Sequence, residues 1–309
     1  MLSELAKLDE NFHCLLLAPP AWGKTSKIIN MLKSTQARWL YIAPLRAIVD
    51  EVFQKLTEQQ VRVFQDQQYS DWLSQPYSVL VTTPEKWLII KKGAIPFHLI
   101  IDEYHLFYLW ESFRPCLEEA KFDLLTSAQK SFLLTASMSH SNLDRWSKEC
   151  EFLTQKSFAI KIGNMELKNR PSRHIHLPIK GISLIQKYLY CYLLFLKFSK
   201  KRVLIFVPYR SWVDWGLRCC QFFAIAGLGC KGGEAQFFRR DLRQNPNVQV
   251  IFATKVLSHG VNLPTLDTVM TTYSEVSQEM MLQMVARAGR RGEKYKLITM
   301  GSITCKWKA

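Results

Sequence analysis

The stretch Cys14-Leu-Leu-Leu-Ala18-Pro-Pro-Ala-Trp-Gly23-Lys24-Thr25 joins a short apolar run to a turn that ends in Gly-Lys-Thr. An apolar run followed by turn residues and a helical pattern is typical of a buried parallel strand that leads into a helix. The backbone N–H groups of such a loop can bind a phosphate, and this chemistry is strongest where the loop enters the helix. The stretch therefore predicts a strand, a phosphate-binding loop and a helix in direct succession.

Each polar side chain of this loop has an expected partner on a nucleotide. The Lys24 ammonium is expected to contact the β- and γ-phosphates, and the Thr25 hydroxyl to bind magnesium. Ala18 stands where the usual pattern begins with glycine, and the alternative is a Gly-Lys-Thr that merely starts a helix. The residues expected to contact the nucleotide are Pro20, Ala21, Trp22, Gly23, Lys24, Thr25 and Ser26.

The same pattern of an apolar run, turn residues and a helical segment recurs along the first half of the chain. The further runs are 39–43, 79–82, 98–101 and 131–134. They predict a doubly wound α/β domain with a parallel sheet, in which functional residues lie at the carboxyl ends of the strands.

A polar segment, 164–180, contains Pro171 and Pro178 and predicts a linker with an entering strand. Beyond it, apolar runs at 202–207, 248–253, 267–270 and 296–299 predict a second sheet. We therefore expect two tandem doubly wound parallel-sheet α/β domains, 1–165 and 166–309.

Two carboxylates follow one of the predicted strands, in Ile100-Ile-Asp102-Glu103-Tyr-His105. A lone Asp-Glu pair at a strand end is commonly a solvated cap. After a phosphate-binding loop, however, the pair predicts magnesium binding by Asp102 and activation of the attacking water by Glu103. His105 is then expected to act near the γ-phosphate and not as a metal ligand.

Near the end of the sequence, Gln283-Met-Val-Ala-Arg287-Ala-Gly-Arg290-Arg291-Gly292 spaces arginines with small residues. Arginine carries a permanent charge in a planar fork that suits phosphate oxygens. Small neighbours allow close approach of the backbone to a ligand. Together with the loop at Lys24, the run predicts a second set of contacts to the same nucleotide.

Taken in order, these segments resemble the conserved motifs of superfamily-2 helicases. Ala18–Thr25, Pro44–Ala47, Thr83–Lys86, Asp102–His105 and Thr135–Ser137 are similar to motifs I, Ia, Ib, II and III; Leu204–Pro208, Ala253–Pro264 and Gln283–Gly292 are similar to motifs IV, V and VI. The wording of Gly260-Val-Asn-Leu-Pro264 and of Gln283–Arg290 is closest to the DExH group that contains superkiller-type RNA helicases and archaeal DNA-repair helicases.

The resemblance implies two RecA-like domains with ATP and Mg²⁺ in a cleft between them. It implies catalytic roles for Lys24, Asp102, Glu103 and His105 in one domain, and for Gln283, Arg287 and Arg290, with arginines acting on the γ-phosphate, in the other. Gly260 is counted among the nucleotide contacts. Hydrolysis would then require closure of the cleft, with ATP favouring the closed state.

The family also implies a groove for a nucleic-acid strand. The candidates are Arg46, Thr83, Lys86, Arg210 and Thr254. A formal net charge of +15 favours a polyanionic partner, although a basic enzyme or an anionic membrane surface is consistent with charge alone. The tryptophans at 72, 87, 110, 212 and 215 are candidates for stacking on bases, with core or partner-docking roles as the alternatives.

Other features bear on location and partners. The N-terminus lacks an apolar signal core, so we expect a cytoplasmic or nucleoid- or nucleus-associated protein that is not secreted. The apolar run 188–196 is too short to span a bilayer and predicts a buried helix; no membrane partner is expected. The chain has no room for the accessory domains of larger relatives, which suggests a protein partner that supplies them.

Three function hypotheses remain. The first is an ATP-dependent helicase or translocase that acts on single-stranded or tailed DNA or RNA, with DNA favoured over RNA. The second is an ATP-gated nucleic-acid-binding or remodelling subunit of a larger assembly, with little unwinding of its own. A phosphate-loop kinase or GTPase is the third, and it leaves the arginine run unexplained.

Overall fold

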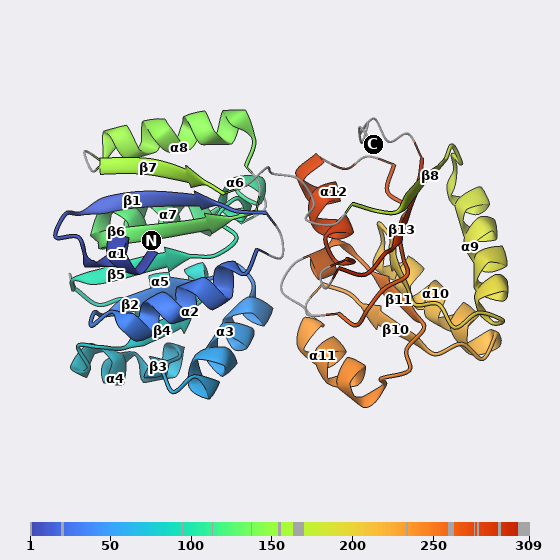
Figure 1. Cartoon of the computed structure of the whole chain (residues 1–309), viewed down its shortest axis with the longest axis horizontal. Coiled ribbons are helices and arrows are strands. Elements are labelled where there is room, and N and C mark those ends of the chain that lie inside the picture. Colours follow the sequence, from blue (N-terminus) through green and yellow to red (C-terminus); the bar gives the residue numbers. More distant parts are fainter. Residues whose placement is uncertain are drawn as a thin grey trace. The chain divides into compact units, whose positions relative to one another are not determined.

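The computed structural model describes residues 2–19, 22–93, 95–112, 114–136, 138–153, 156–162, 170–232, 234–258, 263–274, 276, 278–289 and 292–301. The chain divides into two compact units, Met1–Glu166 and Leu167–Ala309, each with its own sheet and helices (Figure 1). We describe each unit by itself.

In the described part of unit 1, seven strands form one sheet in the order β3-β4-β2-β5-β6-β1-β7, and all pairings are parallel. The strands are β1 (Phe12–Leu17), β2 (Trp39–Ile42), β3 (Val63–Phe64), β4 (Val79–Thr82), β5 (Phe97–Ile101), β6 (Ala128–Thr135) and β7 (Lys156–Lys161). Because β5, β6 and β1 are neighbours, the segments that follow their carboxyl ends meet at one edge of the sheet.

Both faces of this sheet are buried. Along β1, Leu15 and Leu17 pack into one apolar cluster while Cys14 and Leu16 pack into another, as alternation along a strand requires. One face is covered by α1 (Leu2–Lys7), α2 (Lys24–Ser34) and α3 (Arg46–Glu58). The other is covered by α4 (Tyr69–Ser74), α5 (Pro84–Ile90), α6 (Leu106–Leu109), α7 (Cys116–Ser127) and α8 (His140–Phe152). A short 3₁₀ turn, η1 (Asp66–Gln68), precedes α4.

Unit 2 repeats this architecture. Its described residues form a six-stranded parallel sheet in the order β10-β11-β9-β12-β13-β8. The strands are β8 (Arg173–Leu177), β9 (Val203–Phe206), β10 (Gly227–Cys230), β11 (Val250–Ala253), β12 (Thr268–Thr271) and β13 (Lys296–Met300). Helices α9 (Ile182–Leu196) and α10 (Arg210–Phe222) pack on one face, whereas α11 (Ala235–Gln244), η2 (Lys255–Ser258) and α12 (Gln278–Val285) lie on the other.

The expected fold class is confirmed: both units are α/β with a parallel sheet covered on both faces. Each apolar run used for the prediction is a strand, and β8 is the entering strand expected in 164–180. The sequence reading did not name β3, β7 and β10. β3 has only two residues, β7 alternates exposed and half-buried positions, and β10 carries two glycines, so none has a continuous apolar run.

One expectation about this fold was wrong. The segment 188–196 lies on α9 as a helix, but it is not a buried helix. One stripe, Ile185, Leu189, Leu193 and Leu196, packs into the core, while Tyr190, Leu194 and Phe195 are exposed. In the described part of the chain, none of the helices combines the length and apolar character needed to cross a bilayer.

Candidate nucleotide-binding site

The loop between β1 and α2 has the backbone that a phosphate-binding turn requires. Ala18 N–H donates to the Thr135 carbonyl at the end of β6 (3.1 Å), which fixes the start of the loop to the neighbouring strand. Gly23 has a left-handed backbone (φ 87°), which glycine adopts without strain. Lys24 is the first residue of α2, so its N–H and those of Thr25 and Ser26 lie in the first helical turn.

The Lys24 ammonium folds back over this loop. It donates to the carbonyl of Ala18 (2.8 Å) and, at 3.4 Å, to that of Pro19. Its charge also acts on Asp102, where it lowers the carboxyl pKa. Trp22 packs beside the core, with the Lys27 ammonium 4.8 Å from its ring centroid. Pro20 and Ala21, also expected to contact the nucleotide, lie outside the described residues.

Asp102 follows β5 and is 7% exposed. Its N–H donates to the Ile42 carbonyl at the end of β2 (2.9 Å). One carboxylate oxygen accepts the Tyr41 hydroxyl (2.8 Å), and the other accepts the backbone N–H of Glu103 (2.9 Å). Burial, followed by the charge of Glu103, raises the pKa of Asp102 to about 6, against the lowering effects of Tyr41 and Lys24. Asp102 is thus a desolvated carboxylate that favours a compensating cation.

Glu103 turns the chain sharply at the strand end. It has a positive φ of 51°, which is uncommon for a residue with a side chain and marks local strain. Its carboxylate lies 3.6 Å from His105 Nδ1. His105 is fully buried, and the same ring nitrogen lies 3.0 Å from the Thr135 hydroxyl on β6. The predicted acid pair and histidine are therefore joined to the end of the adjacent strand.

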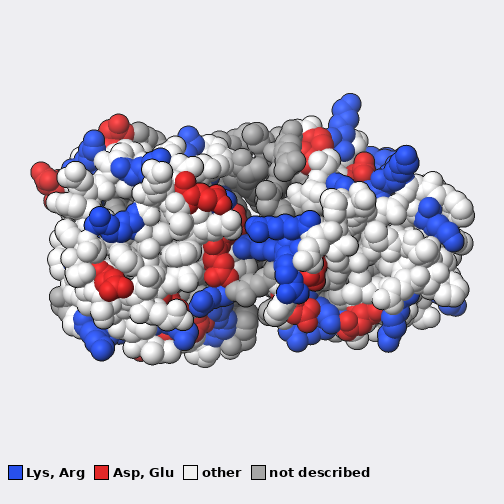
Figure 2. Space-filling model, turned by 90° about the horizontal axis from the view of Figure 1, so that it is seen from below, with Lys and Arg blue, Asp and Glu red and all other residues white. Residues whose placement is uncertain are grey.

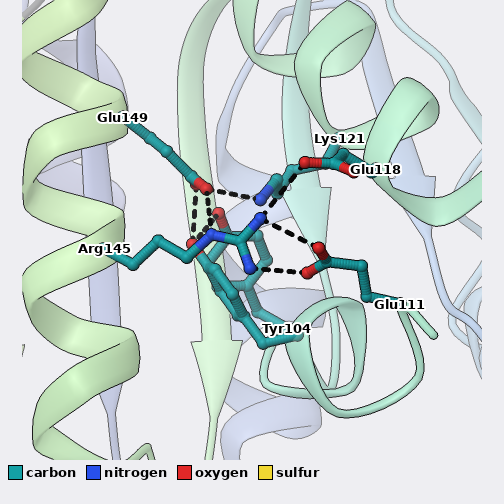
Figure 3. A network of polar contacts seen from close by, with 7 residues as sticks. Tyr104, Glu111, Glu118, Lys121, Arg145 and Glu149 are labelled. Atoms are coloured by element: carbon teal, nitrogen blue, oxygen red, sulfur yellow. Dashed lines mark hydrogen bonds and ion pairs between the residues drawn. The ribbon is translucent and has the colours of Figure 1, made fainter. Parts of the chain in front are cut away.

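Tyr104, between these two residues, points to the opposite side and anchors the turn. Its buried hydroxyl lies 3.2 Å from that of Tyr108, which donates to Glu149 (2.8 Å). Glu149 also accepts the Lys121 ammonium (2.6 Å), and Arg145 bridges Glu149 to further carboxylates on the network shown in Figure 3. The turn at residues 102–105 is therefore tied to α7 and α8 through charge-assisted hydrogen bonds.

In unit 2, the described part of the arginine run is buried. Gln283, on α12, is 4% exposed, and Arg287, just beyond the helix, is 8% exposed. Neighbouring Val285, Ala286 and Ala288 belong to the core, so the small residues of the run serve close packing here. Arg290 and Gly260 lie outside the described residues.

The nucleic-acid candidates of unit 1 follow β2 and β4, which are adjacent strands. Arg46 starts α3, is 47% exposed and makes ion pairs with Asp50 (3.6 Å) and Asp66 (3.3 Å). The Thr83 hydroxyl caps α5 by accepting the Lys86 N–H (3.5 Å), and Lys86 is exposed. The sheet therefore brings the three residues to one edge, where Arg46 already has acidic partners.

Two residues of this edge were missed by sequence reasoning. Tyr41 reads as an ordinary core position of a strand, and nothing in the sequence marks its hydrogen bond to Asp102. Arg114 donates to Glu85 on α5 and to the Pro44 carbonyl (2.9 Å), so it joins α5 to the segment that precedes α3. Both partners of Arg114 lie far from it along the chain, and hydrophobic periodicity does not reveal contacts between such distant positions.

In unit 2, the candidates follow β9 and β11. Arg210 starts α10, is exposed and donates to the Gly232 carbonyl beyond β10. Thr254 follows β11 and its N–H donates to the Cys230 carbonyl (3.1 Å). Since β10, β11 and β9 are consecutive in the sheet, Arg210 and Thr254 belong to the same edge.

The tryptophans separate into two groups. Trp72, Trp87 and Trp212 are at most 6% exposed and belong to the cores, so the core reading is correct for them and base stacking is not. Trp110 and Trp215 are partly buried. On the face drawn in Figure 2, lysine and arginine side chains form one dense group near the middle of the view and smaller scattered groups elsewhere, with broad uncharged areas between them.

Solved structures resemble the whole chain. S. cerevisiae Dbp5 bound to RNA and ADP BeF3 matches 99% of this chain and 83% of that chain, with a TM-score of 0.71 and 14% identity. Mycobacterium smegmatis helicase Lhr bound to ssDNA and AMP-PNP matches 97% of this chain and 45% of that chain, with a TM-score of 0.68 and 17% identity. At these identities the likeness shows the fold, and both units have the RecA-like fold of helicase domains.

Sequence comparison adds family matches. The pre-mRNA-splicing factor brr2 of Schizosaccharomyces pombe is 34% identical over 128 aligned positions, which cover 32% of this chain and 6% of that protein. The chain therefore spans a small part of the length of this relative. Residues 3–146 match the DEAD/DEAH box helicase family, and residues 184–292 match the helicase conserved C-terminal domain. The two domains occur in this order on one chain, which therefore belongs to the superfamily-2 helicases.

Proposed function

We propose that this chain is a nucleic-acid-dependent ATPase that couples ATP hydrolysis to movement along, or opening of, DNA or RNA strands. The observation that carries the proposal is the carboxyl edge of the unit 1 sheet. There, the loop at Lys24, the buried Asp102, the turn at Glu103 and the His105–Thr135 pair converge from three adjacent strands. A nucleoside triphosphate with a metal ion would use all of these groups together.

Each group has a distinct role in this proposal. The N–H groups at the start of α2 and the Lys24 ammonium bind the phosphates. Glu103 orients and deprotonates the attacking water, and His105 relays the state of the γ-phosphate to Thr135 through their 3.0 Å contact. In the structure the Lys24 ammonium donates to two loop carbonyls. On phosphate binding it would exchange these neutral acceptors for charged phosphate oxygens, which form stronger hydrogen bonds.

The residues present fit a magnesium ion. Thr25 and Asp102 offer hydroxyl and carboxylate oxygens, the donor type that Mg²⁺ prefers. The raised pKa of Asp102 shows a carboxylate that lacks sufficient positive charge in its surroundings. Bound there, the ion would neutralise charge on the phosphate oxygens.

We further propose that Gln283, Arg287 and Arg290 supply the donors and positive charge that hydrolysis requires beyond unit 1, with Gly260 and the loop residues Pro20 and Ala21 near the nucleotide. Arg46, Thr83, Lys86, Arg210 and Thr254 are proposed as contacts to strand phosphates. The 47% exposed Arg46 would exchange its acidic partners for phosphate, which makes it the most salt-sensitive contact of this group.

We also propose a helicase group and a preferred polymer for this chain. The DExH wording Asp102-Glu-Tyr-His105 and the partial similarity to brr2 support the DExH group. Relatives in solved structures bind RNA in one case and ssDNA in another, so both polymers belong in the test, with DNA expected to be the better activator.

The test is steady-state ATP hydrolysis by the full chain, with and without matched single-stranded DNA and RNA of the same sequence and length. We expect stimulation by at least one polymer and loss of the stimulated rate in Lys24→Ala. Hydrolysis that is indifferent to both polymers would contradict the proposal. Displacement of a strand from a tailed duplex then separates a helicase from an ATP-gated binding subunit, which would hydrolyse ATP without displacement.

A further inference from the structure

Helix α9 of unit 2 exposes an unusually apolar surface. In the described part of the chain, fourteen large apolar side chains are exposed, and six of them lie between residues 182 and 198. They include Leu184 (57%), Leu194 (45%), Phe195 (58%) and Phe198 (82%). Solvent-facing apolar groups at this density mark an interaction surface more often than a free one.

The outward side chains have the spacing of a helix-pairing seam. Leu184, Lys187, Cys191, Leu194 and Phe198 are separated alternately by three and four residues. The helical path extends to the last of them, because the N–H groups of Lys197 and Phe198 still donate to carbonyls one turn back (3.1 and 3.2 Å). Alternation of three and four is the repeat with which one α-helix packs side chains against another.

The two sides of α9 have separate tasks. Its inward stripe, Ile185 to Leu196 at i, i+4, i+8 and i+11, is buried and holds the helix to the sheet (Figure 1). The outward seam is therefore not needed to attach α9 to its own unit. These exposed apolar side chains therefore do not contribute to the core of unit 2, and a binding partner would explain them.

The charge around the seam has one sign. Residues 182–202 contain four lysines and one arginine but no acidic residue: Lys187, Lys197, Lys200, Lys201 and Arg202. Among the described residues, none of these five makes an ion pair; Asp267 accepts the backbone N–H of Arg202 (2.8 Å). The seam therefore presents apolar groups with uncompensated positive charge beside them.

A pocket continues the seam at the carboxyl end of α9. It has a volume of about 500 Å³ and is lined by Lys197, Phe198, Lys200, Arg202 and Gln249, among others. The Gln249 amide donates to the carbonyls of Leu196 and Ser199, and the Arg202 guanidinium donates to the Pro246 carbonyl (2.6 Å). The ammonium groups of Lys197 and Lys200 are therefore the cations of this pocket best able to receive a ligand. An acidic side chain at the end of a docked helix fits this pocket.

We propose that the outward face of α9 binds an amphipathic α-helix of another protein, one with an apolar stripe flanked by glutamate or aspartate. Its apolar residues would pack on Leu184, Cys191, Leu194 and Phe198, and its acidic residues would pair with Lys187 and with the cations at 197–202. The proposal concerns a surface outside the nucleotide and strand-binding residues, and it does not depend on the proposed function.

Charge and spacing disfavour the other occupants. A second copy of this face would oppose lysine to lysine, which costs energy. A helix lying on a membrane has a broad apolar face with lysines on its polar side, whereas Lys187 interrupts the centre of this seam. A nucleic acid gains little from Leu184, Leu194 or Cys191, because its outer surface is phosphate.

The experiment uses the full chain and three synthetic peptides, each of three heptads with leucine at positions a and d. One carries glutamate at the flanking e and g positions, one carries lysine there, and one is a scrambled version of the acidic sequence. Binding is measured by fluorescence anisotropy. We expect the acidic peptide to bind about tenfold or more tightly than either control.

Substitutions in the chain locate the binding. Leu194→Glu should lower the affinity for the acidic peptide about tenfold or more, whereas Phe237→Glu should leave that affinity unchanged. Phe237 is the control, because it is an exposed apolar residue (58%, against 45% for Leu194) and lies on α11, on the other face of the sheet. Lys187→Glu should lower the affinity for the acidic peptide and raise the affinity for the lysine peptide. ATP hydrolysis and thermal unfolding of all three variants should match wild type.

Several outcomes would overturn the proposal. They are no preference for the acidic peptide over its scrambled form, equal loss in Leu194→Glu and Phe237→Glu, and no change of preference in Lys187→Glu. Sedimentation velocity that shows self-association abolished by Leu194→Glu would assign the face to a second copy. Flotation with phosphatidylserine vesicles that Leu194→Glu abolishes, without peptide binding, would assign it to a membrane.

Discussion

The carboxyl edges of the two sheets share one topology and carry different chemistry. In unit 1 the edge holds buried ionisable groups, Asp102 and His105, each joined to a hydroxyl from a neighbouring strand. In unit 2 the corresponding edge presents Arg210, whose guanidinium donates to the Gly232 carbonyl, and Thr254, whose backbone N–H donates to the Cys230 carbonyl. The same fold therefore supports two tasks, and the side chains at the strand ends decide which.

The difference is electrostatic. At the unit 1 edge, two adjacent acids are partly withdrawn from water, and the pKa of Asp102 is raised to about 6 by that burial and by Glu103. Such a pair is costly unless a cation joins it, so it suits a metal-dependent reaction. Of the described residues at the unit 2 edge, Arg210 and Thr254 can bind phosphates, but neither is a base that could activate water.

The division of tasks between the two units can be tested by replacing a unit 2 arginine that is proposed to act on the nucleotide. Arg290→Ala should lower kcat for ATP hydrolysis about a thousandfold or more, with ATP affinity changed only a few-fold, because such an arginine stabilises charge that develops in the transition state. Hydrolysis and nucleotide binding are measured in parallel. Arg243→Ala, on exposed α11, is the control; equal effects of the two changes would contradict the division of tasks.

A stability measurement tests the buried charge at the unit 1 edge. Because the pKa of Asp102 is raised from 3.8 to about 6, the native state binds the extra proton, and its ionised carboxylate costs stability above pH 6. Asp102→Asn should therefore raise the free energy of unfolding at pH 7.5 by about 1–3 kcal/mol, while abolishing hydrolysis. The gain should shrink as the pH falls through 6 towards 4.

Chemical denaturation at pH 7.5 and 4.5 measures this effect. Asp71→Asn, on exposed α4, should show no such pH-dependent gap. A destabilised Asp102→Asn protein at pH 7.5 would mean that the hydrogen bonds from Tyr41 and Glu103 outweigh the cost of burial.

A smaller effect should follow from Tyr41, which acts through Asp102. Its hydroxyl lowers the pKa of that carboxyl, so Tyr41→Phe should raise it and move the acid limb of the ATPase pH profile to higher pH by about one unit. The profile of kcat/KM between pH 5 and 8 measures the shift. Tyr104→Phe removes an equally buried hydroxyl bonded to Tyr108 and should leave the limb in place. An unmoved limb in Tyr41→Phe would assign the tyrosine a structural role only.

The smallest expected effect concerns the edge of unit 2. Arg210→Ala should weaken single-stranded DNA or RNA binding a few-fold and reduce the slope of log affinity against log salt by about one, because one phosphate contact is lost. Arg218→Ala, exposed on the same helix, is the control. An unchanged slope would remove Arg210 from the strand-binding residues.

Much of this architecture follows from local sequence. The parallel strands were predictable because a strand buried on both faces must be apolar throughout, as Leu15 and Leu16 are on opposite faces of β1. The edge strands β3 and β7 lack that signal, since each contacts the sheet on one side only. The polarity of α9 was misjudged because apolar content does not say which side of a helix faces the core.

The candidate site was predictable where chemistry and chain order coincide. Asp102 stands directly after β5, Lys24 follows the loop after β1, and parallel strands bring these segments together. Tyr41 and Arg114 were not predictable, because their partners lie across the sheet at large sequence separation. The roles of Arg290 and Gly260 remain predictions, since both lie outside the described residues.

The most direct test of the central claim measures ATP binding and hydrolysis together in wild type, Lys24→Ala and Glu103→Gln. The claim is that the carboxyl edge of the unit 1 sheet holds the catalytic base. We predict that Glu103→Gln binds ATP like wild type and hydrolyses it at least about a thousandfold more slowly, while Lys24→Ala loses both. A Glu103→Gln protein with near wild-type turnover in the presence of polynucleotide would contradict the account.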